Sequence, residues 1–270
     1  SVTIPDSVEH IGMITFRDCK KLREVKLSKN LKSIAGGAFN GCSALEKIDI
    51  PDKVESIGPF AFGGCSNLAE IDVPDSLYNV GAGVAENTKW FNDQPNGPVY
   101  FGKVFYGYHG GVPKDTVLTI EEGTVAIAGG CMSDASQKEN LIAVVFPSTM
   151  TRIYAANLFW GCSGLKEAEI PAEVTEIMDK ALGYCFDEEV GELVKVKDYT
   201  IVGVKGTEAE RYANDNGFTF IPIISTGPTP TEYGDANGDD QLSTDDDDKK
   251  PEDKPEDDDE DDEEYEDDEE

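Results

Sequence analysis

The hydrophobic residues near the start of this chain recur with a fixed period of 23. Two consecutive segments, 34–51 and 57–74, carry the same apolar pattern. Its positions are Ile34, Phe39, Cys42, Leu45, Ile48 and Ile50 in the first segment and Ile57, Phe62, Cys65, Leu68, Ile71 and Val73 in the second. A period of about 20 to 29 residues is typical of solenoids, in which one coil cannot bury its apolar face alone. The pattern therefore predicts a stack of coils with a continuous core.

Each unit predicts one short strand and one return turn. Ile48 and Ile50 alternate with charged residues, which is the period of a strand, and Pro51 ends it. Parallel stacking of these strands would give one sheet. The segment Ala-Phe-x-x-Cys would return the chain as a helical turn or a short 3₁₀ piece, with Phe and Cys pointing inward. The same register recurs around Phe16 and around Phe159.

The six cysteines follow the repeat rather than a disulfide framework. Five of them fall at one repeat position: Cys19, Cys42, Cys65, Cys162 and Cys185. An inward-facing free thiol packs as a small hydrophobic group, so we expect a ladder of buried, unpaired cysteines. Cys131 aligns with Ala38 instead, and we expect it to be buried too. A zinc site is not indicated, because the chain has no Cys-x-x-Cys pair and two histidines.

The pattern Ile-x-x-x-Ala-Phe-x-x-Cys-x-x-Leu-x-x-Ile-x-Ile-Pro resembles the BspA-like leucine-rich repeats of bacterial surface proteins. The resemblance covers about residues 1–223 and implies a leucine-rich repeat solenoid with parallel strands and short return turns. It also implies a secreted or cell-surface module that binds protein or glycan through the repeat surface, and no enzyme. The chain shows no Gly-x-Ser-x-Gly or His-Glu-x-x-His motif, and His10 and His109 lie in turn and loop segments.

The period lapses between residues 80 and 120. Within this stretch, 87–118 holds two aromatic-rich strand candidates on either side of Gly102 and Lys103, which predicts a hairpin. Its aromatic rings either cover the solenoid where the regular coil is interrupted or present stacking faces to a sugar ring. The first interpretation is favoured, because aromatic side chains contribute chiefly as packing area.

A helix and a strand are predicted to close the array over 207–221. Thr207 and Glu210 have the spacing of a capping box, and Gly217 is a helix stop. Because an open end of a repeat array exposes its core, we expect these elements to seal the last coil.

The outward positions of the predicted strands form the candidate partner face. They are Glu24, Lys26, Lys47, Asp49, Glu70, Asp72, Glu167 and Glu169. An open sheet of stacked coils is the usual contact surface of such arrays. The face is polar and leans acidic, so it fits either a basic partner or simple exposure to water, the commoner fate of charged side chains.

A candidate calcium loop follows the linker 224–232, which is rich in Pro and Thr. Within 233–246, oxygen ligands occupy the loop positions at which calcium ligands are expected. They are Asp235, Asn237, Asp239, the Gln241 carbonyl, Ser243 and Asp246. The stretch resembles the opening of a dockerin, which implies attachment to a cohesin in an extracellular polysaccharide-degrading assembly. The stretch departs from a dockerin in two ways. Asp240 occupies the sixth loop position, where glycine allows a sharp turn, and no second calcium loop follows.

The C-terminal tail, 247–270, is predicted to be disordered because of its charge. From Asp235 onward the chain carries 23 acidic residues and 3 lysines, hence 20 of its 32 net negative charges. The negative balance argues against nucleic-acid binding, and no apolar run is long enough to span a bilayer. The array itself is long enough to bury a sizeable core.

Overall fold

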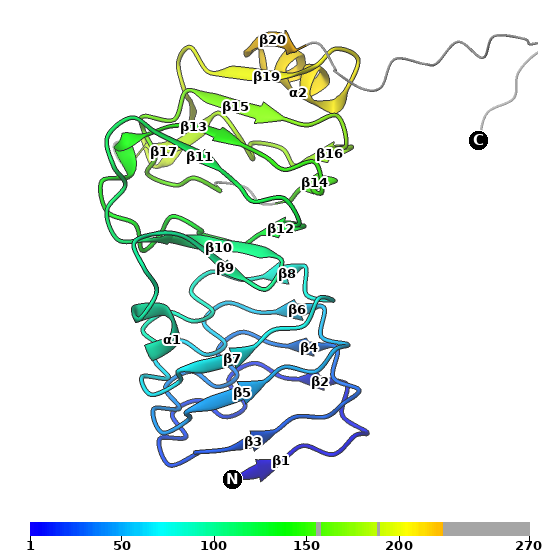
Figure 1. The fold of residues 1–270 in the computed structure, drawn as a ribbon, viewed down its shortest axis with the longest axis vertical. Helices are drawn as coiled ribbons and strands as arrows, with labels where there is room; N and C mark the ends of the chain where they lie inside the picture. Colours follow the sequence, from blue (N-terminus) through cyan, green and yellow to red (C-terminus); the bar gives the residue numbers. More distant parts are fainter. Residues whose placement is uncertain (155–157, 188–189, 224–270) are drawn as a thin grey trace, which may run out of the picture. The chain divides into compact units, whose positions relative to one another are not determined.

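The computed structural model describes residues 1–154, 158–187 and 190–223. The chain divides into two compact units, 1–225 and 226–270, and the described residues all lie in the first. They form a stack of coils in which strands of successive coils lie one above another (Figure 1). The predicted solenoid is confirmed.

One row of strands, here the first strand row, includes the strands predicted around Ile48, Ile71 and Ala168, together with others such as β13 (Leu141–Val145) that were not predicted. Its N-terminal members are β1 (Val2–Thr3), β3 (Val25–Lys26), β5 (Lys47–Asp49) and β7 (Glu70–Asp72). Its C-terminal members are β11 (Thr116–Thr119), β13 (Leu141–Val145), β15 (Glu167–Ile170), β19 (Thr200–Val204) and β20 (Thr219–Ile223). Strands pair in parallel within each sheet, but the row consists of three sheets, β1-β3, β5-β7 and β11-β13-β15-β19-β20, rather than the single sheet expected.

A second strand row runs along another side of the coils and was not predicted. It consists of β2 (His10–Ile11), β4 (Ser33–Ile34), β6 (Ser56–Ile57), β8 (Asn79–Val80), β12 (Ala126–Ile127), β14 (Arg152–Ile153) and β16 (Glu176–Ile177). The residue after the inward Ile of this row is small where coils approach closely. A Cβ atom added to Gly58, for example, would lie 2.4 Å from the backbone nitrogen of Gly36.

The return turns place Phe and Cys inward as expected, but they are plain turns rather than helical pieces. Phe16, Phe39 and Phe62 stack with ring centroids 5.1 and 5.7 Å apart. Cys42 and Cys65 are buried, and their thiols donate to backbone carbonyls of the preceding coil at 3.1 Å. Within the described ranges, the one 3₁₀ segment is η1 (Lys138–Asn140), in a longer loop.

The expected burial of the six cysteines is confirmed at four positions, three of them in the ladder, and wrong at two. Cys42, Cys65, Cys131 and Cys162 are buried and unpaired. Burial raises the pKa of the Cys162 thiol to about 12, so it stays protonated. Cys19 is exposed because it belongs to the first return turn of the described stack, which no earlier return turn covers. Cys185 is half-buried because it belongs to an antiparallel hairpin, β17 (Tyr184–Asp187) and β18 (Glu192–Lys195), instead of a repeat turn.

The predicted hairpin is confirmed and belongs to the core. After α1 (Lys89–Asn92), β9 (Gly97–Phe101) and β10 (Val104–His109) pair antiparallel around Gly102. Side chains of β10 enter two hydrophobic clusters: Val104 and Tyr106 the N-terminal one, Phe105 the C-terminal one. The aromatic rings of this stretch therefore pack against the solenoid, as the favoured interpretation holds.

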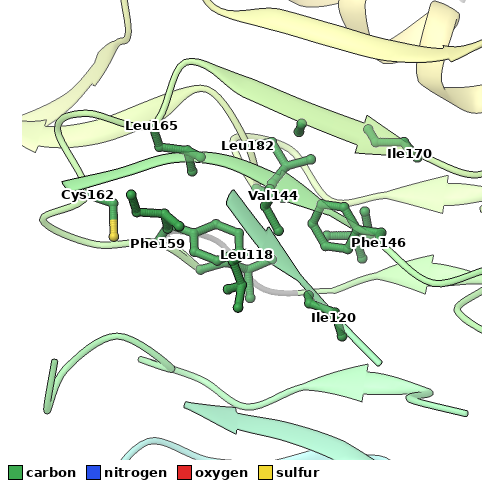
Figure 2. Packing of buried hydrophobic residues seen from close by; sticks show 14 of the residues in the cluster. Leu118, Ile120, Val144, Phe146, Phe159, Cys162, Leu165, Ile170 and Leu182 are labelled. Atoms are coloured by element: carbon green, nitrogen blue, oxygen red, sulfur yellow. The ribbon is translucent and has the colours of Figure 1, made fainter. Parts of the chain in front are cut away.

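The C-terminal cluster fills the coils beyond the hairpin. Figure 2 shows Phe159, Leu165 and Val144 converging between the strands of the first row and the turns opposite. Leu118, Ile120, Phe146 and Ile170 extend the cluster along the same strands. Inward positions of β11, β13 and β15 thus supply one core together with the turn residues.

The array ends in the predicted helix and strand. Helix α2 (Glu208–Asn216) buries Ala209, Tyr212 and Ala213, and Gly217 ends it with a φ of 60°. The capping box forms differently from the expectation. The Thr207 hydroxyl donates to the Val204 carbonyl, and the Glu210 carboxylate accepts from the Gly206 N–H instead of that of Thr207. Neither helix of the described chain has the length and apolar character that crossing a bilayer requires.

Candidate binding surface

A cluster of charged side chains lies on β5 and β7 of the first strand row. The strands pair in register, so that Lys47 faces Glu70 and Asp49 faces Asp72. The Lys47 ammonium lies 3.1 Å from the carboxylate of Asp49, 3.5 Å from that of Asp72 and 3.7 Å from that of Glu70. The hydrogen bond with Asp49 is the chief cause that raises the pKa of Lys47. One ammonium group thus forms ion pairs with three carboxylates.

These side chains point outward because Ile48 and Ile71 alternate with them and face the core. The three carboxylate side chains are 70 to 74% exposed. Exposed pairs of this kind add about 0–1 kcal/mol to stability. The cluster therefore carries two uncompensated negative charges that stay accessible to a partner.

The candidate residues Glu24 and Lys26 lie at the edge of a depression beside this cluster. Strands β3 and β5 belong to separate sheets, and a depression of about 820 Å³ lies over them. Its basic lining residues are Arg23, Lys26, Lys29, Lys47 and Lys53, and its acidic ones are Glu24, Glu46, Asp49 and Asp52. The sequence reasoning missed those that come from turns, because it considered strand positions alone. The face therefore combines a mixed-charge depression with an acidic cluster.

Glu167 and Glu169 lie apart from this cluster, on β15 of the C-terminal sheet. Their register neighbours are Ala143 and Val145 on β13 and Thr200 and Val202 on β19. On the same sheet Val117 is 52% and Ile221 46% exposed. The C-terminal part of the first row is thus largely apolar and neutral, and the acidic character expected for the whole face is confined to the N-terminal coils and this glutamate pair.

Among the described residues, the two histidines make local contacts and no metal-ligand cluster forms. The described residues include no group of three or more His, Cys, Asp or Glu side chains placed to hold a metal ion. His10 bonds through Nδ1 with the Ser33 hydroxyl at 2.7 Å, and the His109 ring packs edge-on against Phe91. The predicted calcium ligands between Asp235 and Asp246 lie outside the described residues.

Several solved structures are similar to the chain at low identity. A leucine-rich repeat protein from Bacteroides ovatus is 19% identical, with 82% of this chain and 77% of that one covered and a TM-score of 0.33. A leucine-rich cell surface protein from Faecalibacterium prausnitzii is 17% identical, with 83% of each chain covered and a TM-score of 0.29. A leucine-rich repeat protein from T. pallidum is 18% identical, with 71% and 79% covered and a TM-score of 0.26.

None of the curated protein sequences compared with the chain matches it. The model of the BspA type leucine-rich repeat region, by contrast, matches in six copies over residues 1–93 and 117–190. The interval that the copies leave out contains the β9–β10 hairpin, where the period lapses. By its repeats, its two strand rows and its ladders of Phe and Cys, the chain belongs to the BspA-type leucine-rich repeat family.

Proposed function

We propose that this chain is a non-enzymatic binding module, displayed outside a bacterial cell, that recognises a protein through the N-terminal part of its first strand row. The observation that carries the proposal is the cluster in which Lys47 lies among the carboxylates of Asp49, Glu70 and Asp72. Membership of the family supports a binding role at the cell surface, since BspA-type repeat proteins are generally surface binding modules.

The partner that this surface fits carries basic side chains. The three carboxylates and the Lys47 ammonium together carry a net charge of two negative units. The carboxylates are largely exposed, so a partner can reach them. Lysine or arginine side chains of a partner would complete the cluster with charge-assisted hydrogen bonds. The neighbouring depression, lined by both signs of charge, would fix the orientation of the partner, because complementary charge contributes specificity and association rate.

Reversing the charge of the cluster is expected to abolish recognition. Asp49→Lys/Asp72→Lys replaces two partner-facing carboxylates by ammonium groups, so binding should weaken by about tenfold or more. The measurement is binding of the chain to an array of immobilised extracellular proteins, followed by titration of the strongest binder. Raising the salt concentration should weaken the same interaction, because exposed charges are screened.

The matched control is Glu121→Lys/Glu173→Lys, which makes the same change in net charge at exposed positions outside the cluster. This control should bind as the wild type does. Equal binding by the cluster variant and the wild type, or equal losses in both variants, would contradict recognition through this face.

We further propose that the segment 233–246 binds one calcium ion as an accessory to recognition. The support is the order of oxygen-bearing residues from Asp235 to Asp246. Calorimetric titration of the chain with calcium should show one discrete site that Asp235→Ala/Asp239→Ala removes. Such a site would justify a direct test of cohesin binding, the partner that the dockerin-like reading implies. Weak, multi-site heat that survives the substitutions would assign the binding to the acidic tail and reject the site.

A further inference from the structure

The second strand row is interrupted between β12 and β14. In four other coils the N–H of the residue after the inward Ile donates to the carbonyl of the inward Ile one coil earlier, whereas the Ala128 N–H in the β12 coil donates to the Phe105 carbonyl of the hairpin. The four bonds are Ala35 to Ile11, Gly58 to Ile34, Gly81 to Ile57 and Met178 to Ile153, at 2.7 to 2.9 Å. The corresponding pair, Tyr154 and Ile127, is described in the structure but makes no such bond. The Tyr154 N–H and the Ile127 carbonyl thus lack the ladder partner that the equivalent groups have in those coils.

A cavity of about 720 Å³ opens at this interruption, beside β8, β12 and β14. Its floor includes the inward side chains of Met150 and Ile153. Tyr78 and Tyr154 also line it, and both are 57% exposed although their rings are large and apolar. The volume lies within the range of about 300–1,000 Å³ that is usual for small-ligand sites.

Polar contacts hold one of the two rings in place. The Tyr154 hydroxyl donates to the Glu176 carboxylate at 2.7 Å, and the Arg152 guanidinium lies 5.6 Å from the centre of the Tyr154 ring. Arg152 is also 3.8 Å from the Glu176 carboxylate. Among the described residues that line the cavity, Arg152 alone is charged, and Glu176 balances it. The cavity is therefore electrically neutral, unlike the charged cluster on the first strand row.

The spacing of the strands decides between two kinds of ligand. Cα atoms of β12 and β14 approach within 8 Å of one another. A peptide strand inserted between them would need two strand spacings, about 9.5 Å, so it does not fit. A hydroxyl group is much smaller than a strand, and it can accept from the Tyr154 N–H while it donates to the Ile127 carbonyl. Aromatic rings beside hydroxyl-binding groups suit a sugar, whose rings have apolar C–H faces and hydroxyl rims.

We propose that this cavity binds a neutral saccharide, one or two rings of a glycan chain, with a sugar ring against Tyr78 or Tyr154 and a hydroxyl between Tyr154 and Ile127. The site lies on the second strand row and does not depend on the protein-binding face. Glycan recognition would then take place on a different side of the coils from protein recognition.

The test uses the full chain and a panel of neutral tetrasaccharides of glucose, galactose, mannose and xylose, with tetragalacturonate as the acidic member. Saturation-transfer NMR should detect at least one neutral tetrasaccharide. Tyr78→Ala/Tyr154→Ala should weaken its binding about tenfold or more, with Tyr78→Ala alone giving a smaller loss. Both side chains are largely exposed, so urea unfolding of the variants should stay close to that of the wild type.

Phe60→Ala is the matched control, since Phe60 is 46% exposed and lines a different depression. This variant should bind the tetrasaccharide as the wild type does. Three results would overturn the proposal: no neutral tetrasaccharide binds, the acidic one alone binds, or the double tyrosine variant binds unchanged. The charge-reversal variants of the first strand row should leave saccharide binding intact, which separates this site from the proposed protein-binding face.

Discussion

Phe39→Ala is expected to lower the free energy of unfolding by about 3–5 kcal/mol. The Phe39 ring is fully buried and stacks on Phe16 below and Phe62 above. Alanine would leave a cavity that neighbouring coils cannot fill, because each ring is held by its own turn. Because coils contact only their neighbours, the loss should destabilise the N-terminal coils first. Urea unfolding followed by circular dichroism measures the change.

Phe60→Ala provides the control for this prediction. Phe60 lies two residues before Phe62 in the same turn, but its side chain is half exposed. Its φ of 55° is left-handed, and alanine keeps a Cβ atom there, so the backbone strain is about the same in both forms. The free energy of unfolding is expected to change by no more than about 0.5 kcal/mol. A loss as large as that of Phe39→Ala would show that the stacked ladder is not the source of stability.

Phe101→Ala is also expected to lower the free energy of unfolding by about 3–5 kcal/mol. The Phe101 side chain is fully buried at the end of β9, with its ring centre 5.3 Å from that of Trp90 and 5.9 Å from that of Tyr106. These contacts join the hairpin to the N-terminal core. If the hairpin is a structural part of the solenoid, truncation of Phe101 should destabilise the array and not only the insert, as measured by urea unfolding.

Tyr100→Phe is the control within the same strand. The Tyr100 hydroxyl accepts from the Glu121 N–H at 2.9 Å, but the ring is only partly buried. Water can replace the lost hydroxyl as the acceptor, so the free energy of unfolding should fall by less than about 1 kcal/mol. A small effect of Phe101→Ala, similar to that of Tyr100→Phe, would mean that the hairpin is peripheral to the solenoid.

The sequence predicted those parts of the fold in which several positions repeat together. The first strand row follows from the alternation of residues such as Ile48 and Ile50 with charges, and the inward Phe and Cys follow from the period of 23. The second row was not predicted because its strands are two residues long and bury at most one residue each, as at Ile34. A strand of that length shows no alternation for a pattern to detect.

Local departures from the repeat explain the other differences. Cys185 has the spacing of a repeat cysteine, yet it lies in the β17–β18 hairpin, which the preceding period does not reveal. Thr207 and Glu210 have the spacing of a capping box, but Glu210 bonds to the Gly206 N–H. In both cases tertiary packing decides between local arrangements that the sequence spacing permits equally.

The candidate surfaces also differ in whether the repeat period determines them. Lys47, Asp49, Glu70 and Asp72 could be placed together from the sequence, because a period of 23 puts them in register. The apolar outward residues of the C-terminal sheet, such as Val117, could not be assigned, because the period lapses before them. The tyrosine cavity depends on a ladder bond that Tyr154 does not make, and no sequence pattern records the absence of a single hydrogen bond.

Carboxyl labelling of the bound chain tests most directly the claim that β5 and β7 carry the recognition surface. The chain is mixed with the protein that it binds most tightly on the array, treated with carbodiimide and glycine ethyl ester, and analysed by mass spectrometry. We predict that the partner protects Asp49, Glu70 and Asp72 from labelling and leaves Glu121 and Glu173 as reactive as in the free chain. Unchanged labelling of the three cluster carboxylates, with protection elsewhere on the solenoid, would contradict it.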